Sequence, residues 1–351
     1  MRWRPTNPSA RSKSWPPRSG VPVDQLVKLD ADENSLWPGR RRVRRRHRRR
    51  QPPHLPRPRP GIALRAAIGR YLDVDPASVV AGAGADDIID ILLRLCMPPA
   101  AVTTPPTFGM YGFLARINRT PIVEAPRHPG FGLDVDAVAR AVADGANMVF
   151  VTSPNNPTGT VTSDEELRAL CALDALVVVD EAYAEFAEDS CVPYVASHSN
   201  LVVLRTFSKW AGLAGLRVGY GIANPALVER MMAIKQPYNV NVAADVAARA
   251  AIEHREEILP TLRALCQERD RMVEELGRFE WLEPVPSQAN FVLFRVQGRS
   301  AAELAASLRR QGVLVRHYDR PDLRDYIRIS AGRPSDTTRL VEAMAAQGAP
   351  A

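Results

Sequence analysis

Polar residues follow the ends of three short apolar segments of the chain. "NMVFVTSPNNPTG" (147–159), "ALVVVDEAY" (175–183) and "NLVVLRTFSK" (200–209) each join an apolar run to a polar loop. Runs in which apolar residues do not alternate with polar ones are typical of parallel strands that are covered on both faces of the sheet. Ligands bind at the carboxyl ends of such strands. We therefore expect one site that combines an amine, a carboxylate and hydroxyl groups. Its first candidates are Asn156, Asp180, Tyr183, Thr206, Ser208 and Lys209.

The elements that must position these residues indicate an α/β fold in two parts. "GIALRAAIGRYL" (61–72) has a helical apolar period, and residues 73–96 pass from a short strand through a glycine turn into a helix. We expect a large domain over 61–245, with a mostly parallel central sheet flanked by helices. Strands and helices alternate again over 246–351, which predicts a smaller α+β domain. Before them we expect an N-terminal tail over 1–20 and an arm over 21–60.

Composition excludes several classes of protein. The 351 residues suffice for a large core, and 46% hydrophobic with 24% charged residues is typical of a globular chain. No apolar run approaches the ~20 residues of a membrane span, and the N-terminus lacks the apolar stretch of a secretory signal. The four cysteines form no CxxC pair, so we expect neither a metal site nor a disulfide framework. We predict a cytoplasmic protein without a membrane partner.

The basic charge of the chain is concentrated in one segment. Nine arginines lie in Arg40–Arg50, and without them the formal net charge of +7 becomes −2. A basic arm that binds nucleic acid and a solvated loop are two interpretations. We favour a third, because back-translated Ser35–Gly39 and His54–Pro60 both read as ordinary globular sequence after a shift of one base. We therefore predict a frame-slipped segment over 35–60 and no nucleic-acid partner.

Four motifs occur in order along the rest of the chain: "SPNNPTG", "VVVDEAY", "TFSKWAGLAGLRVGY" and "YIRIS". Each is common alone, but their order and spacing resemble the fold-type I pyridoxal-phosphate aminotransferases. The histidinol-phosphate aminotransferase branch is the most similar. The resemblance runs from about Val21 to the C-terminus, interrupted only by the arginine-rich segment. It implies pyridoxal 5'-phosphate as cofactor and a homodimer.

The resemblance gives separate roles to the polar residues at the strand ends. Lys209 would hold the cofactor aldehyde as a Schiff base and shuttle the substrate's α-proton, whereas arginine, always protonated, cannot replace it. Asp180 would face the pyridine nitrogen, although it could instead cap a helix that begins in "DEAYAEF". Tyr183 and Asn156 would hydrogen-bond the ring oxygen, and the alternative for Asn156 is turn chemistry in "NNPTG".

The cofactor phosphate needs hydrogen-bond donors without steric bulk. "AGAGADD" (81–87) provides a glycine turn at a helix N-terminus, where free backbone N–H groups favour an anion. An arginine would add a bidentate charged fork, and a salt bridge outside the site is its alternative. The residues expected in this phosphate cup are Gly84, Ala85, Asp86, Thr206, Ser208 and Arg217.

Further residues are expected around the ring and the substrate. Phe108, in "PPTFGMY", resembles the aromatic side chain that stacks on the ring, although it could be a core residue. Arg328 resembles the carboxylate-binding arginine of the family, and Arg316 its neighbour on the adjacent strand. Such a guanidinium pair suits a phosphate ester as well as a carboxylate. Asn34, Tyr238 and Asn239 complete the expected substrate-binding set.

The predicted reaction is transamination of histidinol phosphate with 2-oxoglutarate, giving imidazole acetol phosphate and glutamate in histidine biosynthesis. Because both anions suit the same arginines, an aromatic amino-acid aminotransferase is the alternative. Family members carry, after an "ENP" motif, a tyrosine that crosses the dimer interface, and this chain has "LPRPRP" there. An inactive product of a frame-damaged gene and an arginine-rich nucleic-acid-binding protein are therefore the alternatives from other classes.

Overall fold

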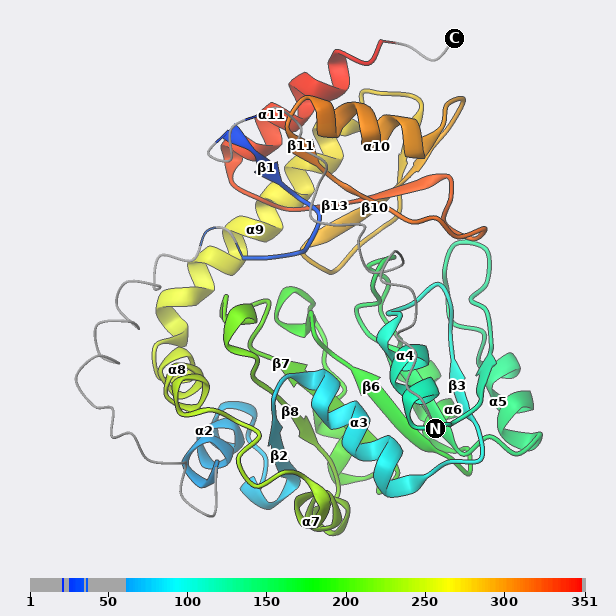
Figure 1. The fold of residues 1–351 in the computed structure, drawn as a ribbon, viewed down its shortest axis with the longest axis vertical. Helices are drawn as coiled ribbons and strands as arrows, with labels where there is room; N and C mark the ends of the chain where they lie inside the picture. Colours follow the sequence, from blue (N-terminus) through cyan, green and yellow to red (C-terminus); the bar gives the residue numbers. More distant parts are fainter. Residues whose placement is uncertain (1–20, 22–24, 35, 37–60, 349–351) are drawn as a thin grey trace, which may run out of the picture.

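The computed structural model describes residue 21, residues 25–34, residue 36 and residues 61–348 (Figure 1). The predicted tail over 1–20 lies outside these residues. So does the suspected frame-slipped segment over 35–60, except for Leu36.

The larger part of the structure is built on a seven-stranded sheet of order β2-β8-β7-β6-β5-β3-β4. All neighbours pair in parallel except β8, which is antiparallel to both β2 and β7. This confirms the predicted α/β fold with a mostly parallel central sheet. The strands are β2 (Val79–Gly82), β3 (Ala101–Thr103), β4 (Ile122–Glu124), β5 (Met148–Thr152), β6 (Leu176–Asp180), β7 (Leu201–Thr206) and β8 (Gly219–Ile222).

Helices cover both faces of this sheet, which explains why its strands are apolar without alternation. In β6, Val178 packs into one apolar cluster, while Val177 and Val179 pack into another. The first cluster contains residues of α3 (Ala85–Cys96), α4 (Met110–Ile117) and α7 (Pro225–Ile234). The second contains residues of α2 (Ile62–Leu72), α5 (Val135–Ala143), α6 (Asp164–Cys171), α8 (Val242–Glu253) and α9 (Arg255–Leu276).

The remaining residues form a smaller body around a four-stranded antiparallel sheet of order β12-β13-β10-β9. Its core is a third apolar cluster, and α9 reaches from the larger body into it (Figure 1). The division of the chain at residue 245 stays a prediction. The elements of this body are β9 (Leu282–Pro284), β10 (Phe291–Val296), α10 (Ala301–Arg310), β11 (Val313–Leu314), β12 (Arg316–His317), β13 (Tyr326–Ser330) and α11 (Pro334–Ala345).

The segment that we call the arm, residues 25–34, joins the smaller body although it comes first in the chain. Its strand β1 (Val27–Lys28) pairs in parallel with β11. Beyond β1, the Leu29 N–H donates to the Leu314 carbonyl at 3.0 Å, and the Ser330 N–H donates to the Leu29 carbonyl at 2.9 Å. These bonds bring the end of the arm beside β13 (Figure 1).

The segments that follow β5 and β6 differ in how they continue. Helix α6 begins with a capping box, in which Ser163 and Glu166 satisfy each other's backbone N–H groups. The helix expected to begin in "DEAYAEF" does not form: only a 3₁₀ turn, Ala184–Phe186, follows β6. Other 3₁₀ turns are Pro76–Ser78, Val192–Ala196 and Ala214–Leu216.

Candidate active site

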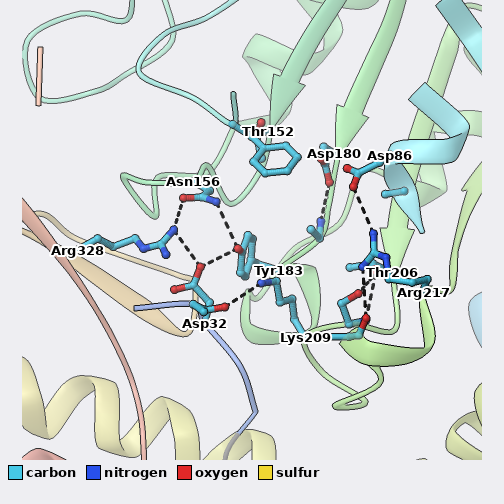
Figure 2. A pocket seen from close by; sticks show the side chains of 16 residues that line it. Asp32, Asp86, Thr152, Asn156, Asp180, Tyr183, Thr206, Lys209, Arg217 and Arg328 are labelled. Atoms are coloured by element: carbon cyan, nitrogen blue, oxygen red, sulfur yellow. Dashed lines mark hydrogen bonds and ion pairs between the residues drawn. The ribbon is translucent and has the colours of Figure 1, made fainter. Parts of the chain in front are cut away.

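A cavity of about 280 Å³ lies at the carboxyl ends of β5, β6 and β7 (Figure 2). Its size is close to the lower end of the roughly 300–1,000 Å³ of small-molecule sites. We call this cavity the pocket. It is lined by Ala31, Asp32, Ala85, Asp86, Phe108, Thr152, Asn156, Asp180, Ala182, Tyr183, Thr206, Ser208, Lys209, Ala214, Arg217 and Arg328.

Lys209 enters the pocket from the loop after β7 (Figure 2). Its Nζ donates to the Ala31 carbonyl at 3.3 Å and lies 5.3 Å from the centre of the Tyr183 ring. Burial lowers the pKa of Lys209, and the nearby Asp32 carboxylate opposes this shift. Among the described residues no ion pair holds its amine. A lowered pKa favours the neutral amine relative to an exposed lysine, and the neutral amine is the form that acts as nucleophile or base.

Asp180, the last residue of β6, presents a buried carboxylate in the same pocket. The Tyr111 hydroxyl donates to Oδ2 at 2.8 Å, and the Ala182 N–H donates to Oδ1 at 3.1 Å. Burial raises the pKa of Asp180 to about 6, while these two hydrogen bonds oppose the rise. No cation pairs with it in the described part of the chain. A buried carboxylate without a counter-charge suits a ligand that brings a positive charge.

A set of groups that are able to bind an anion gathers where α3 begins. Gly84 precedes α3 with φ 97°, and no side chain caps the helix. This φ favours glycine, and a Cβ at Gly84 would lie 2.8 Å from Arg217 Nη2, so a side chain here would displace the guanidinium. The half-exposed Arg217 pairs with Asp86 Oδ2 at 3.3 Å, and Thr206 Oγ1 donates to Ser208 Oγ at 2.8 Å. Free helix N–H groups, hydroxyls and a guanidinium suit a phosphate.

The side of the pocket formed by Arg328 is closed by the end of the arm (Figure 2). Arg328 Nη1 pairs with Asp32 Oδ2 at 3.0 Å and donates to Asn156 Oδ1. The Tyr183 hydroxyl donates to Asp32 Oδ2 at 2.9 Å, and Asn156 Nδ2 lies 3.5 Å from that hydroxyl oxygen. Residues from three separate stretches of the chain thus meet through one carboxylate.

Two predicted asparagines lie outside the pocket lining. Asn34 is buried, and its amide donates to the Trp210 carbonyl at 3.1 Å. Asn239 donates to Asp87 Oδ2 at 2.6 Å, on the first turn of α3. Both amides therefore stabilise segments next to the pocket, and their roles in substrate binding stay predictions.

Arg316, Tyr238 and Gly84 also lie outside the lining, although Gly84 directly precedes Ala85, which is part of it. Arg316 is the register partner of Arg328 on the adjacent strand, as expected, but its guanidinium lies 5.4 Å from the Tyr318 ring centre and is exposed. Tyr238 is 42% exposed. Any contact of these side chains with substrate stays a prediction.

The structure adds two residues that the motifs did not predict: Tyr111, which lies behind the pocket lining, and Asp32, which is part of it. Tyr111 is fully buried in the core, yet its hydroxyl bonds both Asp180 and Thr152 Oγ1, the latter at 2.7 Å. Asp32 lines the pocket where Asn34 was expected. The only signal for Asp32 in the sequence is its position in the arm, because its partners lie far along the chain.

Comparisons with known proteins identify the relatives of this chain. The family model described as aminotransferase class I and II matches residues 48–344. A histidinol-phosphate aminotransferase of Dehalococcoides mccartyi is 40% identical over 326 residues, which cover 92% of this chain and 91% of that protein. One of Roseiflexus castenholzii is 42% identical over 338 residues (93% and 91%), and a chloroplastic one of Nicotiana tabacum is 41% identical over 332 residues (93% and 80%).

Solved structures share the fold. A histidinol-phosphate aminotransferase of Sinorhizobium meliloti, described in complex with pyridoxal-5'-phosphate, superposes with a TM-score of 0.85 at 23% identity and covers 99% of each chain. One of Clostridium acetobutylicum gives a TM-score of 0.83 at 23% identity, covering 92% of this chain and 99% of that one. The chain therefore belongs to the class I and II aminotransferase family, as its motifs predicted.

Proposed function

We propose that this protein transaminates histidinol phosphate with 2-oxoglutarate, using pyridoxal 5'-phosphate. The observation that carries the proposal is its similarity to curated histidinol-phosphate aminotransferases, at 40% identity over 92% of the chain. The pocket supports it, because Lys209 and Asp180 line the same cavity beside a phosphate-type anion site.

Four groups in the pocket would hold this cofactor. The buried Asp180 carboxylate has no cation partner in the described residues and would keep a ring nitrogen protonated. The start of α3, with Thr206, Ser208 and Arg217, would bind the phosphate. Phe108, which lines the pocket, would cover a ring face, and its edge-to-face contact with Tyr111 fixes its orientation. Tyr183 and Asn156 would hydrogen-bond the ring oxygen.

When bound, pyridoxal phosphate supplies an electron-accepting ring that stabilises negative charge at the substrate's α-carbon. Lys209 would take the α-proton on Nζ and return it later, a role that its lowered pKa favours. Arg328 would bind the anionic group of each substrate in turn. The amino donor, histidinol phosphate, and the amino acceptor, 2-oxoglutarate, would use the same site. They would therefore bind one after the other, and each would react in its own half of the cycle.

Turnover by the purified protein tests the proposal. With 2-oxoglutarate as acceptor, we expect histidinol phosphate to be a better amino donor than phenylalanine, by kcat/KM. Lys209→Ala should abolish turnover and the absorbance band of the bound cofactor, whereas Lys28→Ala, outside the pocket lining, should keep both. Equal or reversed preference for phenylalanine would contradict the substrate assignment, and a retained band in Lys209→Ala would contradict the site.

The homodimer and the cytoplasmic location belong to the same proposal. None of the helices in the described ranges combines the length and apolarity that a bilayer crossing requires. Exposed apolar side chains at Phe113 and Ile117, one turn apart on α4, would suit a subunit contact. Analytical ultracentrifugation of the holoenzyme should give twice the 38.6 kDa chain mass, and a monomer at micromolar concentration would contradict the dimer.

A further inference from the structure

Asp32 is a buried carboxylate that lies beside Arg328 in the pocket. It is 2% exposed and has a left-handed backbone, with φ 53°. Its N–H donates to Ser330 Oγ at 3.0 Å, and Asn290 Nδ2 donates to its carbonyl at 3.1 Å. Aspartate is one of the few non-glycine residues that adopt this conformation, and these hydrogen bonds fix the position of its carboxylate.

The same carboxylate forms an ion pair with the guanidinium of Arg328. Asp32 Oδ2 pairs with Nη1 at 3.0 Å, and Oδ1 accepts a hydrogen bond from Ser330 Oγ at 2.6 Å. The other donors of Arg328 are only partly used: Nη2 donates to the Asp30 carbonyl at 3.0 Å, and the buried Nε has no partner among the described residues. An incoming anion must therefore share Arg328 with Asp32 or replace it.

We propose that Asp32 is a specificity-determining residue, an internal carboxylate that competes with the substrate's anionic group for Arg328 and so limits how tightly the pocket holds anions. The inference rests on the proposed function in one respect, the binding of substrate anions by Arg328. It deepens that function, because one guanidinium must release each anionic product before the next anion binds. Coulomb repulsion is proportional to the product of the charges, so Asp32 weakens the binding of dianions more than that of monoanions.

Asp32→Asn removes the charge while it preserves the size of the side chain. Its oxygen can still accept from Ser330, and its amide can donate to the Tyr183 hydroxyl oxygen. Asp32→Gly removes the carboxylate altogether and suits a residue with φ 53°, so it answers the question if the asparagine variant does not fold. Glu33→Gln is the matched control, since Glu33 is an exposed carboxylate of the same arm that pairs with Lys28 at 3.2 Å.

Titration calorimetry on the cofactor-loaded protein measures the effect without turnover. With acetate as monoanion and inorganic phosphate at pH 8 as dianion, Asp32→Asn should tighten acetate binding about fivefold and phosphate binding about 25-fold, because doubling the ligand charge squares the factor. Asp32→Gly should tighten both in the same order, and Glu33→Gln should change neither by more than about twofold, since an exposed charge is screened.

Unchanged or weakened anion binding in both Asp32 variants would overturn the proposal, because Asp32 would then position Arg328 for the substrate and not compete with it. An equal factor for acetate and phosphate would overturn the electrostatic argument. The outcome is independent of the substrate assignment: a wild-type protein that does not turn over histidinol phosphate would refute the proposed function and leave this measurement unaffected.

Discussion

Asp180 should make the cofactor-free protein less stable as the pH rises. Burial disfavours the charged carboxylate and raises the pKa of Asp180 from its ordinary value of 3.8 to about 6 in the fold. The folded state therefore binds the proton more tightly than the unfolded chain. The stabilisation that proton binding gives to the folded state is complete below about pH 3.8, and it is lost as the pH rises through about 6. The difference of about two pKa units corresponds to about 3 kcal/mol.

Asp180→Asn removes this pH-dependent loss. The asparagine oxygen can accept from the Ala182 N–H, and the amide can donate to the Tyr111 oxygen, which still reaches Thr152. Without cofactor, the variant should exceed the wild type in free energy of unfolding by about 1.5 kcal/mol at pH 5 and about 3 kcal/mol at pH 8. Aminotransferase turnover should nevertheless be lost, because the amide cannot hold a protonated ring nitrogen.

Urea unfolding of the cofactor-free proteins at both pH values measures the difference. Altered hydrogen bonding would change the free energy of unfolding of the variant by the same amount at pH 5 and pH 8. The diagnostic quantity is therefore the increase, from pH 5 to pH 8, in the difference between variant and wild type. Asp319→Asn, a change of an exposed carboxylate outside the pocket, is the control and should show no such growth. A difference that is constant or shrinks with pH would refute the claim that Asp180 is an uncompensated buried charge.

Three further substitutions test the pocket and its support. Gly84→Ala, at φ 97° and 2.8 Å from Arg217 Nη2, should cost about 1–3 kcal/mol of stability and weaken pyridoxal phosphate binding in equilibrium dialysis. Tyr111→Phe removes the donor to Asp180 Oδ2 and should raise the pKa of Asp180 by about one unit, which moves the pH dependence of urea unfolding upward. Ser163→Ala breaks the capping box of α6 and should cost about 1 kcal/mol in urea unfolding, with turnover unchanged, because it lies outside the pocket.

The central strands and the polar residues after them could be predicted because both depend on local sequence. Apolar runs identify β5, β6 and β7, and Asp180 and Thr206 are the last residues of their strands. The three-residue strands β3 and β4 carry too little pattern to be recognised. The helix expected after Asp180 failed for a physical reason, since Glu181 and Glu185 bind the buried Arg205 and hold the segment in a 3₁₀ turn.

The two residues that the motifs missed, in the pocket and directly behind it, depend on contacts between distant parts of the chain. Tyr111 has the position of a core residue of α4, and only the packing of α4 on the sheet brings its hydroxyl to Asp180. Asp32 faces Arg328 because the arm pairs with β11 and β13. No local pattern in the arm indicates these partners. The sequence motifs therefore predict the pocket residues that lie on the large sheet. The pocket residues that the arm supplies can be identified only from the structure.

The pairing of β1 with β11 also bears on how the protein is made. Asp32 and Ser330, which hydrogen-bond each other, are 298 residues apart in sequence. During synthesis on a ribosome, the arm cannot pair with β11 and β13 until almost all of the chain has been made. Contacts of such long separation form late, so nascent chains would gain competence for anion binding only at the end of translation, and a premature stop before β13 would yield a product without a finished pocket.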